Sequence, residues 1–124
     1  MRGCQELNAP ARILVVEDEA LVAFALEEML MDFGYAVVGP APSVDSAMKL
    51  LSAEKIDAAI LDVNLGGESI EPVAGALAAV DVPFVFTTGY TNASALPQGF
   101  KDRPALNKPY QPEALRDAVA RLLG

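Results

Sequence analysis

The chain has 124 residues, a length that suits one domain with a buried core. Its composition, 52% hydrophobic and 21% charged, is that of a globular protein, and its formal net charge of −8 disfavours binding to nucleic acid or to an anionic membrane surface. Because the chain contains no histidine and one cysteine, the sequence excludes histidine-based catalytic triads, zinc–histidine sites and an internal disulfide.

The first eleven residues differ from the rest of the chain. They show no hydrophobic periodicity and include Pro10, so we expect a flexible leader at 1–11 and one domain at 12–124. They also lack the apolar core of a signal peptide, and no apolar run reaches the roughly 18 residues that a membrane-spanning helix needs. Since the single cysteine fits a reducing compartment, we expect a soluble, cytoplasmic protein without a membrane partner.

Short apolar runs alternate with amphipathic segments along the domain. The run 13–16 is continuously apolar, which is typical of a parallel strand covered on both faces. Five strands alternating with helices predict an α/β fold, a doubly wound parallel sheet between two layers of helices. The expected strands are 12–16, 35–39, 56–61, 83–87 and 104–107. The expected helices are 20–33, one capped by Ser43, one capped by Ser69 that runs to about Val80, and one that follows Pro112.

Two segments fit this alternation less simply. In the first helix Leu21, Phe24 and Ala25 lie outside the main apolar stripe; we interpret this as a thick core helix, with a docking face for a partner helix as the alternative. Between 89 and 102, Pro97 and Gly99 leave room only for a short helix, so we expect a loose segment there.

Polar residues follow the expected strands at the edge where such sheets bind their ligands. Glu17 and Asp18 follow the first strand, Asp62 the third, Thr88 the fourth and Lys108 the fifth. Converging carboxylates repel one another by roughly 4 kcal/mol per pair at about 4 Å and an effective dielectric constant of about 20. A hard divalent cation at this edge would relieve the repulsion.

The types of donor at this edge favour magnesium. With oxygen ligands from Asp18 and Asp62, a backbone carbonyl near Asn64 and water, Mg2+ fits better than zinc because no histidine or nearby thiol is available. Thr88 offers a hydroxyl donor and Lys108 a positive charge to the same place. The sequence therefore predicts phosphoryl transfer to Asp62, with catalysis by positioning and charge neutralisation.

At these residues the sequence resembles the receiver domains of two-component response regulators. The resemblance covers about residues 12–124 and implies a flavodoxin/CheY-like three-layer sandwich with strand order 2-1-3-4-5. The motifs that carry it are Val16-Glu17-Asp18, Leu61-Asp62-Val63-Asn64, Pro83-Phe84-Val85-Phe86-Thr87-Thr88-Gly89 and Lys108-Pro109-Tyr110.

The resemblance implies a signalling role rather than an enzymatic one. Asp62 would accept phosphate from the phosphohistidine of a histidine kinase or a histidine phosphotransfer protein. Mg2+ would be held by Asp18, Asp62 and the backbone carbonyl of Asn64, and Glu17 would act largely through metal-bound water. The expected protein is a single-domain receiver, a monomer or weak dimer, that signals to a further protein and not to nucleic acid.

The resemblance also implies roles for residues around the phosphoryl group. Thr88 and Lys108 would contact the phosphoryl oxygens, and the peptide before Pro109 can be cis. Asn64 and Tyr90 fall where the family tunes hydrolysis of the acyl phosphate.

The sequence departs from the family pattern at two positions. Ala105 stands where the family usually has an aromatic switch residue, so we hypothesise that Thr88 and the segment 89–102, which begins with Gly89, move as a unit instead. Gly66 replaces a usual proline, and we interpret it mainly as permitting a tight loop with positive φ. Gly66 with Gly67, the short helix expected between 89 and 102, and the Phe-x-Phe-Thr-Thr-Gly-Tyr run at 84–90 resemble a subgroup of single-domain receivers. That subgroup has a Phe-Ala-Thr-Gly-Tyr-like motif, and Thr87 stands where the motif has alanine.

Two other classes of function remain open from the residues alone. An aspartate-nucleophile phosphohydrolase that needs magnesium would typically have a second acid two residues after the nucleophile, and this chain has Asn64 there. A flavodoxin-like cofactor binder would need a hydroxyl-rich phosphate loop after the first strand, where Glu17, Asp18 and Glu19 would repel a phosphate.

Overall fold

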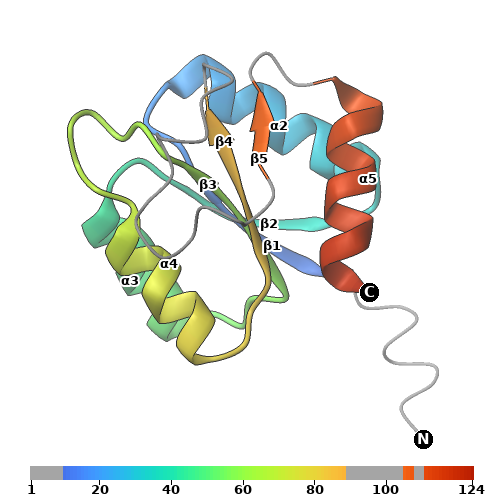
Figure 1. Cartoon of the computed structure of the whole chain (residues 1–124). Coiled ribbons are helices and arrows are strands. Elements are labelled where there is room, and N and C mark those ends of the chain that lie inside the picture. The colour runs from blue at the N-terminus through green and yellow to red at the C-terminus, as the bar shows by residue number, and fades with distance from the viewer. Residues whose placement is uncertain (1–9, 89–104, 108–110) are drawn as a thin grey trace, which may run out of the picture.

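The structure is a computed structural model that describes residues 10–88, 105–107 and 111–124 (Figure 1). Within these residues five strands form one sheet in which all neighbours run parallel. The strand order is β2-β1-β3-β4-β5, which confirms the predicted fold class. The strands are β1 (Arg12–Val16), β2 (Ala36–Ala41), β3 (Ala58–Asp62), β4 (Phe84–Thr88) and β5 (Ala105–Asn107), and the helices are α2 (Ala20–Asp32), α3 (Val44–Ala53), α4 (Glu71–Ala79) and α5 (Pro112–Leu123).

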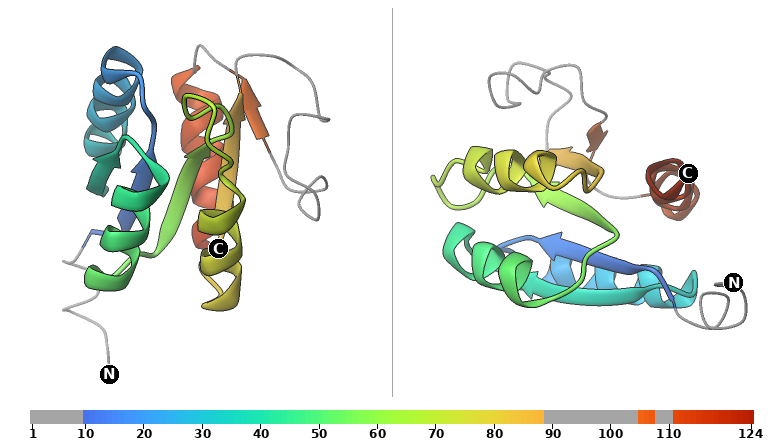
Figure 2. Two further views of the ribbon diagram at one scale, coloured as in Figure 1. Left: turned by 90° about the vertical axis from the view of Figure 1, so that its left-hand side faces the viewer. Right: turned by 90° about the horizontal axis from the view of Figure 1, so that it is seen from below.

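Helices cover both faces of the sheet. α2 and α5 lie on one face and α3 and α4 on the other, so that three layers result (Figures 1 and 2). Successive strand residues alternate between two hydrophobic cores. Leu14 and Phe86 belong to the core beneath α3 and α4, whereas Val15 and Val85 belong to the core beneath α2 and α5. Burying one side chain of this size contributes about 1.5–3 kcal/mol, so both cores hold the central strands in place.

The three central strands are buried along almost their whole length. Every residue of β3 and β4 is buried, and in β1 only Arg12 is partly exposed. This explains why these strands show apolar runs without a polar alternation. β1 leads into α2 on one face of the sheet, and β3 leads into α4 on the other (Figure 1). The carboxyl ends of β1 and β3 therefore form the topological switch point, where open α/β sheets bind ligands.

Two helix starts depend on serine side chains. The Oγ of Ser43 accepts the backbone N–H of Ser46 at 3.2 Å, and the Oγ of Ser46 accepts the N–H of Ser43 at 3.2 Å, which confirms the predicted cap of α3. The predicted cap of α4 at Ser69 is wrong by one residue, because the N-cap is Ile70 and the helix begins at Glu71. The Oγ of Ser69 nevertheless accepts the N–H of Glu71 at 3.1 Å.

The end of β2 differs from the prediction. The strand runs to Ala41, through Pro40, instead of ending at Gly39. Its pairing with β1 shifts register between Leu14 and Val16, and the Gly39–Pro40 peptide is cis. Proline is tolerated in edge strands and at bulges, and here it lies in an edge strand at an irregularity of the pairing. The sequence signal for a turn therefore marks an irregularity within the strand.

The interpretation of α2 as a thick core helix is wrong. Its buried residues are Ala23, Leu26 and Leu30, whereas Leu21 is 85% exposed and Phe24 58% exposed. A helix that packs against a sheet buries one stripe, and these two residues lie outside it. The alternative interpretation, a docking face, stays a prediction.

No helix among the described residues is both long enough and apolar enough to cross a membrane.

Gly39 offers a test of the irregular β2 edge. Its φ is 99°, and an added Cβ would lie 2.7 Å from the Ala41 nitrogen and 3.0 Å from the Val15 carbonyl oxygen. Gly34 has a similar φ of 95°, but nothing lies within 4 Å of its Cβ position. We expect Gly34→Ala to lower the free energy of unfolding by about 1 kcal/mol from backbone strain alone, and Gly39→Ala by about 3 kcal/mol or more. Urea denaturation would measure both values, and equal losses would contradict the close packing at Gly39.

Candidate functional site

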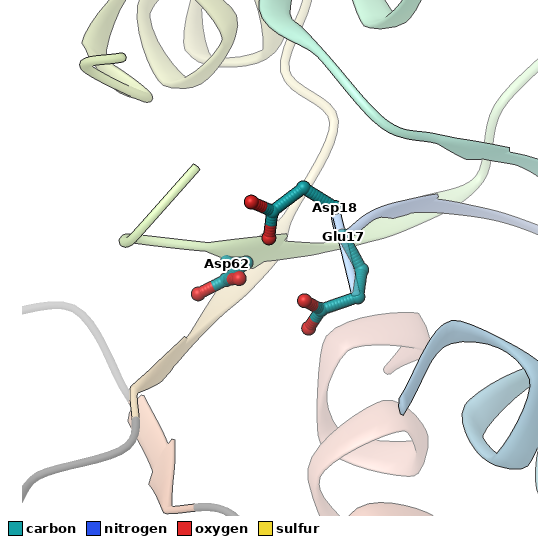
Figure 3. A group of neighbouring side chains, drawn as sticks. All are labelled: Glu17, Asp18 and Asp62. Atoms are coloured by element: carbon teal, nitrogen blue, oxygen red, sulfur yellow. The ribbon is translucent and has the colours of Figure 1, made fainter. Parts of the chain in front are cut away.

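Three carboxylates gather at the switch point of the sheet. Glu17 and Asp18 directly follow β1, and Asp62 is the last residue of β3 (Figure 3). β1 and β3 pair side by side, with Val16 opposite Leu61, so the parallel strands deliver the three side chains to one place. One carboxylate oxygen from each residue lies within 4.8 Å of the other two. The predicted convergence of these acids is confirmed.

The three carboxylates differ in burial. Glu17 is 2% exposed and Asp62 is 1% exposed, whereas Asp18 is exposed. Buried carboxylates are normally compensated by hydrogen bonds and by opposite charge. Part of this compensation comes from the backbone, because Oδ1 of Asp62 accepts the N–H of Asn64 at 3.0 Å and Oε2 of Glu17 accepts the N–H of Glu19 at 3.1 Å. These bonds orient the carboxylates, but the N–H groups are neutral and leave the negative charge in place.

This group of oxygens suits a hard divalent cation. Carboxylate oxygens at this separation can share one ion, which relieves the repulsion among them. Because two of the acids are buried and one faces solvent, an ion at the site would be held by the protein and still reach water. The donor set is all oxygen among the described residues, which favours magnesium or calcium over zinc.

The loop between β3 and α4 returns to Asp18. Gly66 and Gly67 have φ values of 56° and 91°, which confirms the predicted tight loop. A Cβ placed on Gly66 would lie 3.4 Å from Oδ2 of Asp18, a proximity that the sequence did not indicate. The loop is closed by an isolated bridge between Leu65 and Glu68. The backbone at position 66 therefore forms one wall of the site.

Two threonines end β4 beside the carboxylates. Thr88 is 5% exposed and Thr87 is 1% exposed. Thr87 lies directly opposite Asp62 in the β3–β4 pairing, and its carbonyl oxygen accepts the N–H of Val63 at 3.0 Å. Thr88 is the last residue of β4 and lies at the same edge of the sheet, and its contact with a phosphoryl group stays a prediction. Thr87 was not among the residues predicted from the sequence, where it is visible only as a hydroxyl residue next to Thr88 at the end of an apolar run.

The other predicted site residues fall into two groups. Ala105 is the exposed first residue of β5 and pairs with Phe86, and Asn64 contributes its backbone N–H to Asp62. Gly89, Tyr90 and Lys108, the segment 89–102 and the peptide before Pro109 lie outside the described residues, as does most of the predicted leader.

Comparisons with known proteins agree with this geometry. The family model for the response regulator receiver domain matches residues 13–120. The chain is 32% identical over 116 residues to the phyllosphere-induced regulator PhyR of Methylorubrum extorquens; the match covers 90% of this chain and 43% of that protein. The chain spans about half the length of the curated relatives it matches.

Solved structures give closer matches. The solution structure of SdrG from Sphingomonas melonis Fr1 is 46% identical with a TM-score of 0.82, covering 94% of this chain and 99% of that one. The BeF3-activated conformation of SdrG has a TM-score of 0.79 at the same identity and coverage. The response regulator TrrA of Thermotoga maritima, in complex with Mg(2+)-BeF, is 28% identical with a TM-score of 0.80, covering 91% of this chain and 99% of that one.

The family model spans most of the chain, and the carboxylates occupy the switch point of the matching fold. The chain belongs to the response regulator receiver domain family.

Proposed function

We propose that Asp62 is the phosphoacceptor of this receiver domain and that Mg2+ is bound beside it. The observation that carries the proposal is the convergence of Asp62 with Glu17 and Asp18 within 4.8 Å at the carboxyl edge of the sheet. Asp62 is 1% exposed, so its carboxylate sits where water is scarce and where electrostatic interactions are stronger than in solution. Two relatives support the proposal, since SdrG has a BeF3-activated conformation and TrrA binds Mg(2+)-BeF.

Asp62 is the proposed nucleophile. The Asn64 N–H donates to Oδ1 and fixes the orientation of the carboxylate, and one carboxylate oxygen would attack phosphorus. A phosphoryl group moves from a phosphohistidine nitrogen to this oxygen, so that a P–N bond breaks while a P–O bond forms. Asp18, Asp62 and the Asn64 carbonyl are the proposed metal ligands, with Glu17 acting through water. When bound, the ion supplies positive charge that offsets the carboxylates and the incoming phosphoryl oxygens.

Donors on the neighbouring strands complete the proposed site. Thr88 ends β4 next to β3, so its hydroxyl is a candidate donor to a phosphoryl oxygen. Lys108, which follows β5 in the sequence, is the proposed cation that offsets phosphoryl charge. Tyr90, Gly89 and Ala105 are proposed to tune the lifetime and the signal of the phosphorylated state.

The proposal extends to partners. The phosphodonor is a histidine kinase or a histidine phosphotransfer protein in the cytoplasm, and the phosphorylated chain, a monomer or weak dimer, acts on a further protein. A formal net charge of −8 supports protein partners over nucleic acid. Membership in the receiver family argues against both the phosphohydrolase and the cofactor-binding alternatives.

Labelling with acetyl phosphate tests the phosphoacceptor. We expect one Mg2+-dependent, base-labile phosphoryl group per chain in the wild type, and a loss of label to background in Asp62→Asn, because the amide is not a nucleophile. Intact-protein mass spectrometry with and without EDTA would measure the label. Asp45→Asn is a matched control, since Asp45 is exposed on α3 and contacts Lys49 at 3.2 Å. Undiminished label in Asp62→Asn would assign the phosphoacceptor to another residue.

Stability without metal tests the repulsion among the carboxylates. Asp62→Asn removes one charge and keeps an oxygen acceptor for the Asn64 N–H. In EDTA we expect the variant to have a free energy of unfolding higher than the wild type by about 1 kcal/mol, because fewer like charges converge. Saturating Mg2+ should stabilise the wild type by mass action and the variant much less.

Urea denaturation in EDTA and in Mg2+ would provide these four values. Asp45→Asn should leave the response to Mg2+ unchanged, since Asp45 lies on α3 as part of an exposed i,i+4 pair. A variant less stable than the wild type in EDTA, together with an equal response to Mg2+, would contradict the proposed metal site.

A further inference from the structure

The buried hydroxyl of Thr87 is the feature of the site that the proposed function leaves unexplained. Oγ1 of Thr87 is inaccessible to solvent and has no hydrogen-bond partner among the described residues. The residue itself is 1% exposed. A valine would fill nearly the same volume without burying a polar group. The cost of an unsatisfied buried hydroxyl is equivalent to roughly 5- to 150-fold in the folding equilibrium, so its presence calls for a physical reason.

Thr87 and Asp62 are immediate neighbours on the same face of the sheet. The two residues are directly opposite each other in the β3–β4 pairing, and adjacent strands lie about 4.8 Å apart. The preceding residues on that face, Ile60 and Val85, both belong to the core beneath α2 and α5, and side chains alternate along a strand. The side chains of Asp62 and Thr87 therefore leave their strands in the same direction.

We propose that Thr87 is a positioning residue of the Asp62 site, whose hydroxyl gains its hydrogen-bond acceptor when Asp62 carries a phosphoryl group. This inference rests on the proposed function. Phosphorylation of Asp62 gives an acyl phosphate, in which one carboxylate oxygen becomes a bridging atom and three phosphoryl oxygens, all acceptors, are added. The number of acceptors near the neighbouring strand thus increases on loading. Thr87 already has its backbone fixed by the bond from Val63 N–H to its carbonyl oxygen, so only the hydroxyl has to rotate.

In this role the hydroxyl favours the loaded state, in which Asp62 carries a phosphoryl group or its analogue beryllofluoride. An unsatisfied donor destabilises the unloaded protein, and satisfying it stabilises the loaded protein, so the difference adds to the affinity for the group that supplies the acceptor. A hydroxyl with a purely structural role would stabilise both states equally. The two roles are therefore separable by comparing stability without ligand and affinity for ligand in the same variants.

The test uses the full chain with beryllofluoride and Mg2+ as the probe of the loaded site. We expect Thr87→Val to weaken the apparent beryllofluoride affinity about tenfold, which corresponds to the loss of one charge-assisted hydrogen bond. Thr87→Ser keeps the hydroxyl and should restore the affinity to within about twofold. Without ligand, Thr87→Val should be at least as stable as the wild type. Fluorine NMR titrations would measure the affinity, and urea denaturation the stability.

Val85→Thr is the matched control. It places a hydroxyl on the same face of β4, two residues before Thr87 and within the apolar core beneath α2 and α5. We expect it to lower stability without ligand, since a polar group is buried, and to leave the beryllofluoride affinity unchanged. Thr87→Ala, which also lacks the hydroxyl, is titrated in parallel and should show the same loss of affinity.

Each outcome decides the inference. A tenfold loss in Thr87→Val with recovery in Thr87→Ser supports it. Equal affinities in the wild type and in Thr87→Val overturn it, as does a large loss of stability in Thr87→Val without ligand, which would mean that the hydroxyl is already satisfied in the unloaded protein. A wild type that binds no beryllofluoride would instead overturn the proposed function together with this inference.

Discussion

The convergence of like charges at one edge of the sheet is the constraint on which this structure depends. Glu17, Asp18 and Asp62 bring carboxylate oxygens within 4.8 Å of one another, and two of these side chains are almost fully buried. Such an arrangement is unfavourable by itself, because the negatively charged carboxylates repel one another. It persists because the strands that carry the acids are held by two hydrophobic cores, one on each face of the sheet. The hydrophobic cores stabilise the fold, and part of this stabilisation offsets the repulsion among the carboxylates.

Backbone groups from neighbouring segments surround the carboxylates in a defined arrangement. Backbone N–H groups orient Asp62 and Glu17, and the glycine loop between β3 and α4 brings the backbone at position 66 against Asp18. The same loop is connected to the start of α3, because Oε1 of Glu68 accepts the N–H of Val44 at 3.1 Å. This hydrogen bond is a direct contact between the loop at the acidic edge and α3, and it does not involve position 105.

Helix α2 carries apolar side chains on its exposed face as well as on its buried face. Leu21, Phe24 and Met31 are 85%, 58% and 59% exposed, and acidic residues surround the last two. Apolar residues grouped on a surface often mark a contact with another molecule. From the sequence, Leu21 and Phe24 were interpreted as part of a thick core helix, since hydrophobicity alone does not say which side of a helix meets the sheet.

The sequence by itself determined the alternation of strands and helices, and hence the parallel sheet and the edge at which Glu17, Asp18, Asp62 and Thr88 lie. These features follow from apolar runs and their polar ends, which are local properties of the chain. Only the tertiary structure decided that β2 continues through Pro40, that Phe24 faces outward, and that the hydroxyl of Thr87 shares the face of Asp62. Those outcomes depend on strand register and on packing between segments distant in sequence. Local periodicity limits which residues can be buried, but contacts between distant elements select which ones are.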